Sequence, residues 1–94
     1  MGAAVNKNRD MMDTSMMLIL RYKSPVVALK DIVEDYMSHI DMASAKQRAA
    51  KCQLPFPAFK IDGNKSEYFV NLSDVAMWLD SLQKESQLNW SEVN

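Results

Sequence analysis

The sequence predicts a small α+β fold, mainly helical, in which three helices precede a β-hairpin and a fourth helix follows it. Two observations carry this prediction. Apolar residues recur at helical spacing in separate segments, and a cluster of turn-forming residues at 62–66 lies between two short β-forming segments. The chain has 94 residues, a length that suffices for one domain, which we place at 14–87 between tails at 1–13 and 88–94.

The composition excludes several kinds of site. One cysteine cannot form an internal disulfide, and one cysteine with one histidine cannot make a structural zinc site of Cys and His ligands. Two glycines exclude a GxGxxG fingerprint and a Walker-type phosphate loop. The longest apolar run, 16–20, is far shorter than the ~20 residues of a membrane span. We therefore expect a cytoplasmic protein with no cofactor, no metal and no membrane contact.

The first helix is predicted from Thr14, which can serve as its N-cap, to Tyr22 or Lys23. Ser24-Pro25 ends it, because the residue before a proline is pushed out of the helical region. Residues 1–13 lack any hydrophobic period and are predicted to form a flexible tail. Val26 and Val27 are predicted to be extended.

The clearest helix signal comes next. Six apolar residues fall at i, i+3, i+4, i+7, i+8 and i+11, which is the spacing of a helix that faces a core: Leu29, Ile32, Val33, Tyr36, Met37 and Ile40. Asp31, Glu34 and Asp35 fall on the opposite face and are expected in solvent. The helix is expected to end between Met37 and His39, with His39 as a capping or surface group.

A third helix is predicted at 42–53, with Asp41 as its N-cap. Its inner stripe consists of small or flexible apolar residues, which allow close packing: Met42, Ala45, Ala49 and Cys52. Its outer stripe carries hydrogen-bond donors at i, i+3, i+4 and i+7: Ser44, Gln47, Arg48 and Lys51. The few residues that join this helix to the preceding one are typical of a helix-turn-helix.

Leu54-Pro55-Phe56-Pro57 enforces an extended path after the third helix. Strands are then predicted at 58–61 and 67–70, and together they form a hairpin that could act as a wing. Asn71 is predicted to cap a last helix that ends by 85–87, with Asp74 near its positive end. The tail at 88–94 is polar apart from Leu88, Trp90 and Val93, and Trp90 is a candidate anchor for a partner.

The net charge of −1 conceals an asymmetry. Residues 46–65 contain five basic residues and one acid, whereas residues 66–94 contain five acids and one base. The basic block coincides with the third helix and the hairpin, the two elements of a winged helix-turn-helix that touch DNA. Solvated surface charges with no partner are the alternative interpretation.

The candidate DNA contacts follow from this coincidence. Arg48 and Lys51 can donate to guanine edges or phosphates, and Gln47 can pair with adenine. Lys46 flanks the stripe and is expected to contact phosphate. The full set predicted to contact double-stranded DNA is Ser44, Lys46, Gln47, Arg48, Lys51, Lys60, Asn64, Lys65 and Ser66. No acid–base pair or activated nucleophile can be assembled, so we predict no catalytic residue and no enzyme activity, and Cys52 is expected to be buried and inert.

Several motifs along the chain share the pattern of a known family. They are the apolar run from Thr14 to Tyr22, Val27-Ala28-Leu29 before a helix with Tyr36, Leu54-Pro55-Phe56-Pro57-Ala58-Phe59-Lys60, Lys65-Ser66, and Val70-Asn71-Leu72-Ser73-Asp74-Val75-Ala76. Over 14–87 the chain resembles the pyocin activator (PrtN-like) proteins of bacteria and their prophages. The resemblance implies a DNA-binding transcription activator with a winged helix-turn-helix of the MerR and excisionase kind.

Three functions remain open on the sequence. A transcription activator would bind DNA specifically and leave an acidic surface for RNA polymerase. An excisionase-like protein would bend DNA to direct a recombinase. A phage-encoded inhibitor of a regulator would bind protein and show no salt-dependent affinity for DNA. A homodimer is expected from the small size and the predicted DNA binding.

Overall fold

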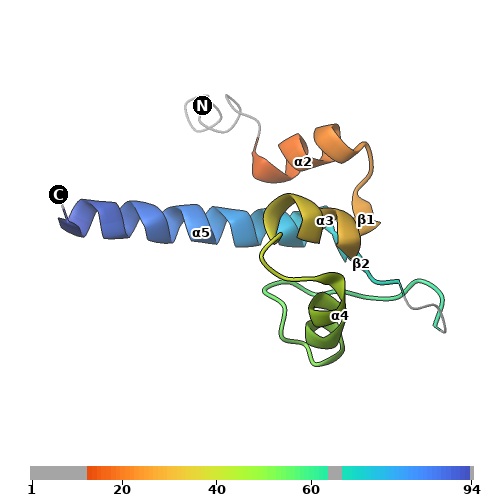
Figure 1. Cartoon of the computed structure of the whole chain (residues 1–94). Coiled ribbons are helices and arrows are strands. Elements are labelled where there is room, and N and C mark those ends of the chain that lie inside the picture. The colour runs from red at the N-terminus through yellow and green to blue at the C-terminus, as the bar shows by residue number, and fades with distance from the viewer. Residues whose placement is uncertain (1–12, 64–66, 94) are drawn as a thin grey trace.

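The structure is a computed structural model that describes residues 13–63 and 67–93. Within these residues the chain is an α+β protein, mainly helical (Figure 1). Its elements, in order, are α2 (Thr14–Tyr22), β1 (Val26–Ala28), α3 (Leu29–Tyr36), α4 (Met42–Ala50), β2 (Phe69–Asn71) and α5 (Leu72–Val93). The helices predicted from apolar spacing are therefore all present.

The long helix α5 organises the molecule. Figure 1 shows α2 and α4 on opposite sides of the first part of α5, with α3 between them, while the rest of α5 projects away from the globule. The principal extents of 49 × 34 × 19 Å reflect this projection. Within the described residues, no helix is both long enough and apolar enough to cross a membrane.

The core forms where α3 meets β2 and the beginning of α5. Its largest fully buried side chains come from these three elements: Leu29, Ile32, Val70, Leu72 and Val75. Leu18 of α2 and Phe56 of the loop after α4 close the core at its edges. The apolar face predicted for α3 is thus the face that is buried.

The sheet differs from the predicted hairpin. β2 pairs antiparallel with β1, with Val27 opposite Val70. The predicted strand 58–61 contributes one bridge, in which the backbones of Phe59 and Phe69 exchange hydrogen bonds of 2.9 and 2.7 Å. The predicted pairing of 58–61 with 67–70 is thus present at this single antiparallel bridge, whereas the pairing of β2 with β1 was not predicted. Phe69 already uses its other edge to pair with Ala28, so the middle strand of this small sheet is β2.

The helix starts are set by side chains that accept backbone N–H groups. Asp41 and Asn71 cap α4 and α5 as predicted, accepting from the N–H groups of Ser44 at 2.8 Å and Ser73 at 3.0 Å. The predicted N-cap of α2, Thr14, was wrong. Asp13 takes that role and accepts from the N–H of Met16 at 2.9 Å, because a carboxylate satisfies the free amides of a first turn.

Two helix ends differ from prediction. α4 ends at Ala50 rather than at residue 53, because Cys52 adopts the left-handed conformation at φ 56° and turns the chain. Cys52 is consequently exposed, and the prediction that it is buried on the inner stripe was wrong. α5 continues to Val93, so its predicted end at 85–87 was also wrong.

Candidate nucleic-acid interface

The start of α4 is fixed by Asp41. The hydrogen bond from the Ser44 amide, together with one from the Ser44 side chain, lowers the pKa of Asp41 below its ordinary value. Ser44 was predicted to lie on the outer stripe. The structure places it half-buried in the first turn, as the partner of this cap.

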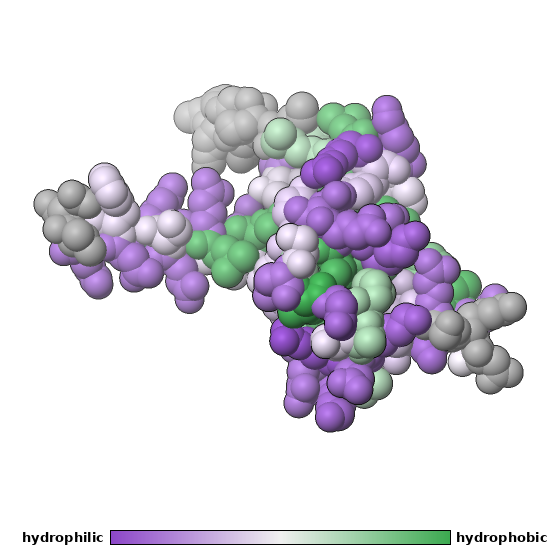
Figure 2. All heavy atoms as spheres, in the orientation of Figure 1, coloured by the Kyte–Doolittle hydropathy of each residue, from purple (hydrophilic) through white to green (hydrophobic). Residues whose placement is uncertain are grey.

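Two alanines hold α4 against the rest of the fold. Ala45 is fully buried and Ala49 is 9% exposed. Because alanine adds one methyl group beyond the backbone, α4 can lie close to its neighbours. The remaining surface of the helix is left to solvent, and Figure 2 shows it as a hydrophilic region.

The outward surface of α4 carries three cations and an amide. Lys46, Gln47, Arg48 and Lys51 are all exposed, as predicted. The ion pair between Arg21 and Asp35 is the one that the described residues show, so none of the three cations of α4 forms an ion pair with a described carboxylate. Lys51 lies at the C-cap, where its N–H donates to the carbonyl of Gln47 at 3.1 Å. The sequence therefore identified the composition and the direction of this face correctly.

Lys60 is connected to this face through Tyr68. Its Nζ lies 5.0 Å from the centre of the Tyr68 ring, a cation–π contact. Tyr68 in turn lines a hollow of about 260 Å³ with Lys30, Met42, Lys46 and Glu67. The base of the predicted wing thus lies beside the start of α4. The predicted wing residues Asn64, Lys65 and Ser66 lie outside the described residues.

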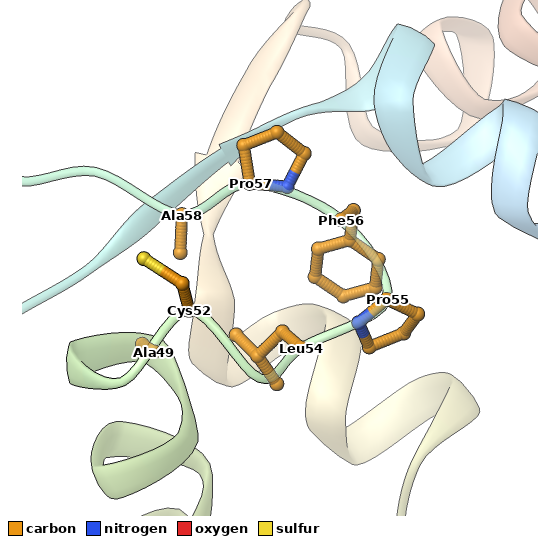
Figure 3. Close-up of a pocket in the computed structure, with 7 residues that line it drawn as sticks. All are labelled: Ala49, Cys52, Leu54, Pro55, Phe56, Pro57 and Ala58. Carbon is orange, nitrogen blue, oxygen red and sulfur yellow. The ribbon is translucent and has the colours of Figure 1, made fainter.

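The loop after α4 is anchored to α5. The ring of Phe56 is buried and packs edge-on against Trp78, with centroids 5.3 Å apart and an interplanar angle of 63°. This loop and the end of α4 line a pocket of about 440 Å³ (Figure 3). Every lining side chain apart from that of Cys52 is hydrocarbon, so the pocket carries no charged group for catalysis or for an ionic ligand.

A second cluster joins α2 to α3, and sequence reasoning missed it. Arg21 lies 3.2 Å from Asp35 and donates to the hydroxyl of Tyr36 at 3.0 Å, while the hydroxyl of Tyr22 donates to Asp35 at 2.5 Å. Burial, and then the bond to Asp35, raise the pKa of Tyr22 above its ordinary range. Asp35 is exposed, as predicted, but it also joins this cluster, which the prediction did not include. The available signal was that a half-buried tyrosine needs a partner for its hydroxyl.

The described part of the chain contains no cluster of side chains suited to catalysis or to metal binding. No group of three or more His, Cys, Asp or Glu side chains there could hold a metal ion. His39 and Cys52 are both exposed, the latter beside the apolar pocket. The exposed polar face of α4 is therefore the feature of this region that needs a functional explanation.

Comparison with protein families decides the relationship of the chain. The family described as pyocin activator protein PrtN matches residues 14–86. The chain belongs to the pyocin activator protein family. The match runs from the start of α2 into α5, and so includes α4, the proline-containing loop and the whole predicted wing. Searches of curated proteins and of solved structures give no significant match.

Proposed function

We propose that this protein is a sequence-specific DNA-binding activator of transcription for a phage or bacteriocin-like element. The observation that carries the proposal is the outward face of α4, where Lys46, Arg48 and Lys51 are exposed and unpaired among the described residues. Membership of the pyocin activator family supports a regulatory role. On this proposal the protein works in the bacterial cytoplasm, where such DNA is transcribed.

We infer that the DNA-binding unit is a winged helix-turn-helix. α3 and α4 are joined by residues 37–41, and α4 is followed by a loop that returns to the sheet through the bridge between Phe59 and Phe69. In this arrangement α4 is the recognition helix and lies in the major groove. The segment between Phe59 and Phe69 is the wing, which contacts the adjacent phosphates through Asn64, Lys65 and Ser66.

The side chains divide into two roles. Arg48 and Gln47 are suited to base edges, because guanidinium pairs with guanine and amide pairs with adenine in two hydrogen bonds. Lys46, Lys51 and Lys60 are suited to phosphates, where a flexible ammonium acts as a point charge. Ser44 is close enough to the start of α4 to contact a phosphate beside the helix N-terminus.

Fluorescence anisotropy with DNA from the gene's own neighbourhood tests the proposal. We expect tight binding to a specific site and weaker binding to unrelated DNA, both decreasing as salt is raised. Arg48→Ala should weaken specific binding by about 1–3 kcal/mol, roughly 5- to 150-fold. Arg48→Lys keeps the charge and loses the bidentate geometry, so it should preserve nonspecific binding and still lose specificity.

Lys84→Ala is the matched control, because Lys84 is an exposed lysine on the part of α5 beyond the globule. It should leave affinity unchanged. Absence of binding at low salt by the folded protein would refute the assignment of α4 as a recognition helix. A circular-permutation bending assay separates the activator from the excisionase-like alternative, which requires a sharp bend.

A further inference from the structure

Exposed apolar side chains are concentrated on two helices. Ten large hydrophobic residues are substantially exposed in the described structure, and eight of them lie on α2 or α5. They are Met16, Met17, Ile19, Leu20, Met77, Leu82, Leu88 and Trp90. A concentration of exposed apolar side chains is a sign of an interaction site.

α2 is apolar on its outer side. Leu18 is buried against the domain, yet Met16, Met17, Ile19 and Leu20, which cover the remaining faces, are 39–56% exposed. We call these four residues the α2 outer face. Figure 2 shows apolar surface over α2 at the edge of the molecule. A helix that packs on one side is expected to be polar on the other, so this face needs a partner.

α5 has one covered half and one half that is exposed to solvent. α2 runs alongside the first half, since Thr14 donates to Asp80 at 2.5 Å and the amide of Leu72 donates to the carbonyl of Pro25. All described side chains from 80 to 92 are exposed. We call residues 81–93 the α5 extension.

The core-facing side of α5 continues into this extension. Leu82 lies three residues after Leu79, and Trp90 lies eleven residues, or three helical turns, after Leu79. Leu79, Leu82 and Trp90 therefore share one side of the helix. Leu79 packs against the core, whereas Leu82 is 44% and Trp90 69% exposed. Leu88 lies on the opposite side of the helix. Two exposed apolar side chains, Leu82 and Trp90, therefore continue the core-facing side of α5 beyond the domain.

We propose that the α2 outer face binds the α5 extension of a second copy of this chain, in a two-fold dimer that contains the contact twice. At 1.5 Å per residue α2 spans about 13 Å and the extension about 20 Å, so the extension is long enough to cover the whole of α2. The six apolar side chains of the two surfaces, at on the order of 100 Å² each, supply most of the roughly 800 Å² that each partner buries in a specific interface.

The distribution of charge favours contact between α2 and the extension over contact between two copies of the same helix. The C-terminal end of α2 carries Lys23 and also Arg21, which is already paired with Asp35, whereas the extension carries Glu85 and Glu92 against one lysine. Contact between α2 and the extension brings opposite charges together. Contact between two extensions would bring acids together. The exchange also leaves α4, on the other side of α5, open to DNA (Figure 1).

Sedimentation equilibrium tests the dimer without DNA, so its failure is separate from failure of the proposed function. The expected mass of the wild-type protein is twice 10.7 kDa. Leu20→Gln and Trp90→Gln should each reduce it to 10.7 kDa, with circular dichroism confirming that the fold is retained. Matched controls are Ile61→Gln, outside both surfaces, and Leu88→Gln, on the side of the extension opposite Leu82 and Trp90. Both replace aliphatic residues of similar exposure and should leave the dimer intact.

A mixing experiment distinguishes the exchange from other dimers. When Leu20→Gln and Trp90→Gln proteins are combined, a heterodimer regains one wild-type contact, so a species of twice the monomer mass should reappear. Failure of the mixture to dimerise, or a wild-type chain that is monomeric at all concentrations, would overturn the proposal. A third outcome also overturns the proposal. If the wild-type protein is monomeric and Leu20→Gln abolishes activation while DNA binding is retained, the α2 outer face binds the transcription machinery instead.

Discussion

α3 and α4 are neighbours of similar length that are held in place in different ways. α3 buries Leu29, Ile32 and Val33 in the centre of the core. α4 buries Ala45 and Ala49 and directs its long side chains outward. The difference means that α3 anchors the fold, whereas α4 can change its outer residues without disturbing the core.

The largest effect on stability should come from a substitution in α3, which anchors the fold. Ile32 is fully buried, so Ile32→Ala removes a packed side chain and leaves a cavity, and should lower the free energy of unfolding by about 2–5 kcal/mol. Ile32→Val should cost about 0.5–1.5 kcal/mol. Urea unfolding followed by circular dichroism measures both. Equal stability of the two variants would show that the site relaxes around the lost atoms.

α4 should be sensitive to added volume rather than to lost volume. Ala45→Leu forces a larger side chain into a fully buried position and should destabilise the protein by about 1–3 kcal/mol. Ala50→Leu is the matched control at an exposed position on the same helix, expected to change stability by less than about 0.5 kcal/mol. Equal effects of the two variants would contradict close packing of α4.

The N-caps of α3 and α4 predict how the stability of the protein depends on pH. α3 has no side-chain cap, whereas α4 depends on the carboxylate of Asp41, whose pKa is lowered. A lowered pKa stabilises the folded state above the ordinary value of 3.8, and this contribution is lost as the pH falls through the lowered value. Asp41→Ala should therefore lower Tm at neutral pH.

Asp41→Asn supplies the control for this effect, because asparagine caps a helix without titrating. Its Tm should match that of the wild type near neutrality and fall less on acidification. Thermal melts between neutral pH and pH 3 give the comparison. Parallel melting curves across that range would contradict a titrating cap.

The smallest effect should be on the outer face of α4. Gln47→Ala removes an exposed side chain and should change the free energy of unfolding by less than about 0.5 kcal/mol. Chemical denaturation measures this, and affinity for specific DNA is the property expected to decrease. A loss of stability above 1 kcal/mol would mean that this face also contributes to the fold.

The features that sequence predicts well are local. The apolar period of α3 and the caps at Asp41 and Asn71 depend on residues within a few positions of one another, and all three were confirmed. The outward direction of Lys46, Gln47 and Arg48 follows in the same way from the spacing of apolar residues within α4.

The features that sequence misses depend on distant partners. β2 pairs with β1, more than forty residues earlier, because the adjoining helices bring them together, and no local turn signal encodes that choice. The cluster of Arg21, Tyr22 and Asp35 likewise joins two helices. The position of Cys52 depended on one left-handed residue that the alanine-rich pattern of α4 did not foretell.

The junction at Asn71 makes α5 a lever. β2 ends at this residue and α5 begins at the next, with no linker to absorb a change of direction. At 1.5 Å per residue the 22-residue helix is about 33 Å long, so a tilt of about 10° at the sheet would move its far end by about 6 Å. A small adjustment of the sheet, which also holds the loop bridged by Phe59, is thereby magnified at the opposite end of the molecule.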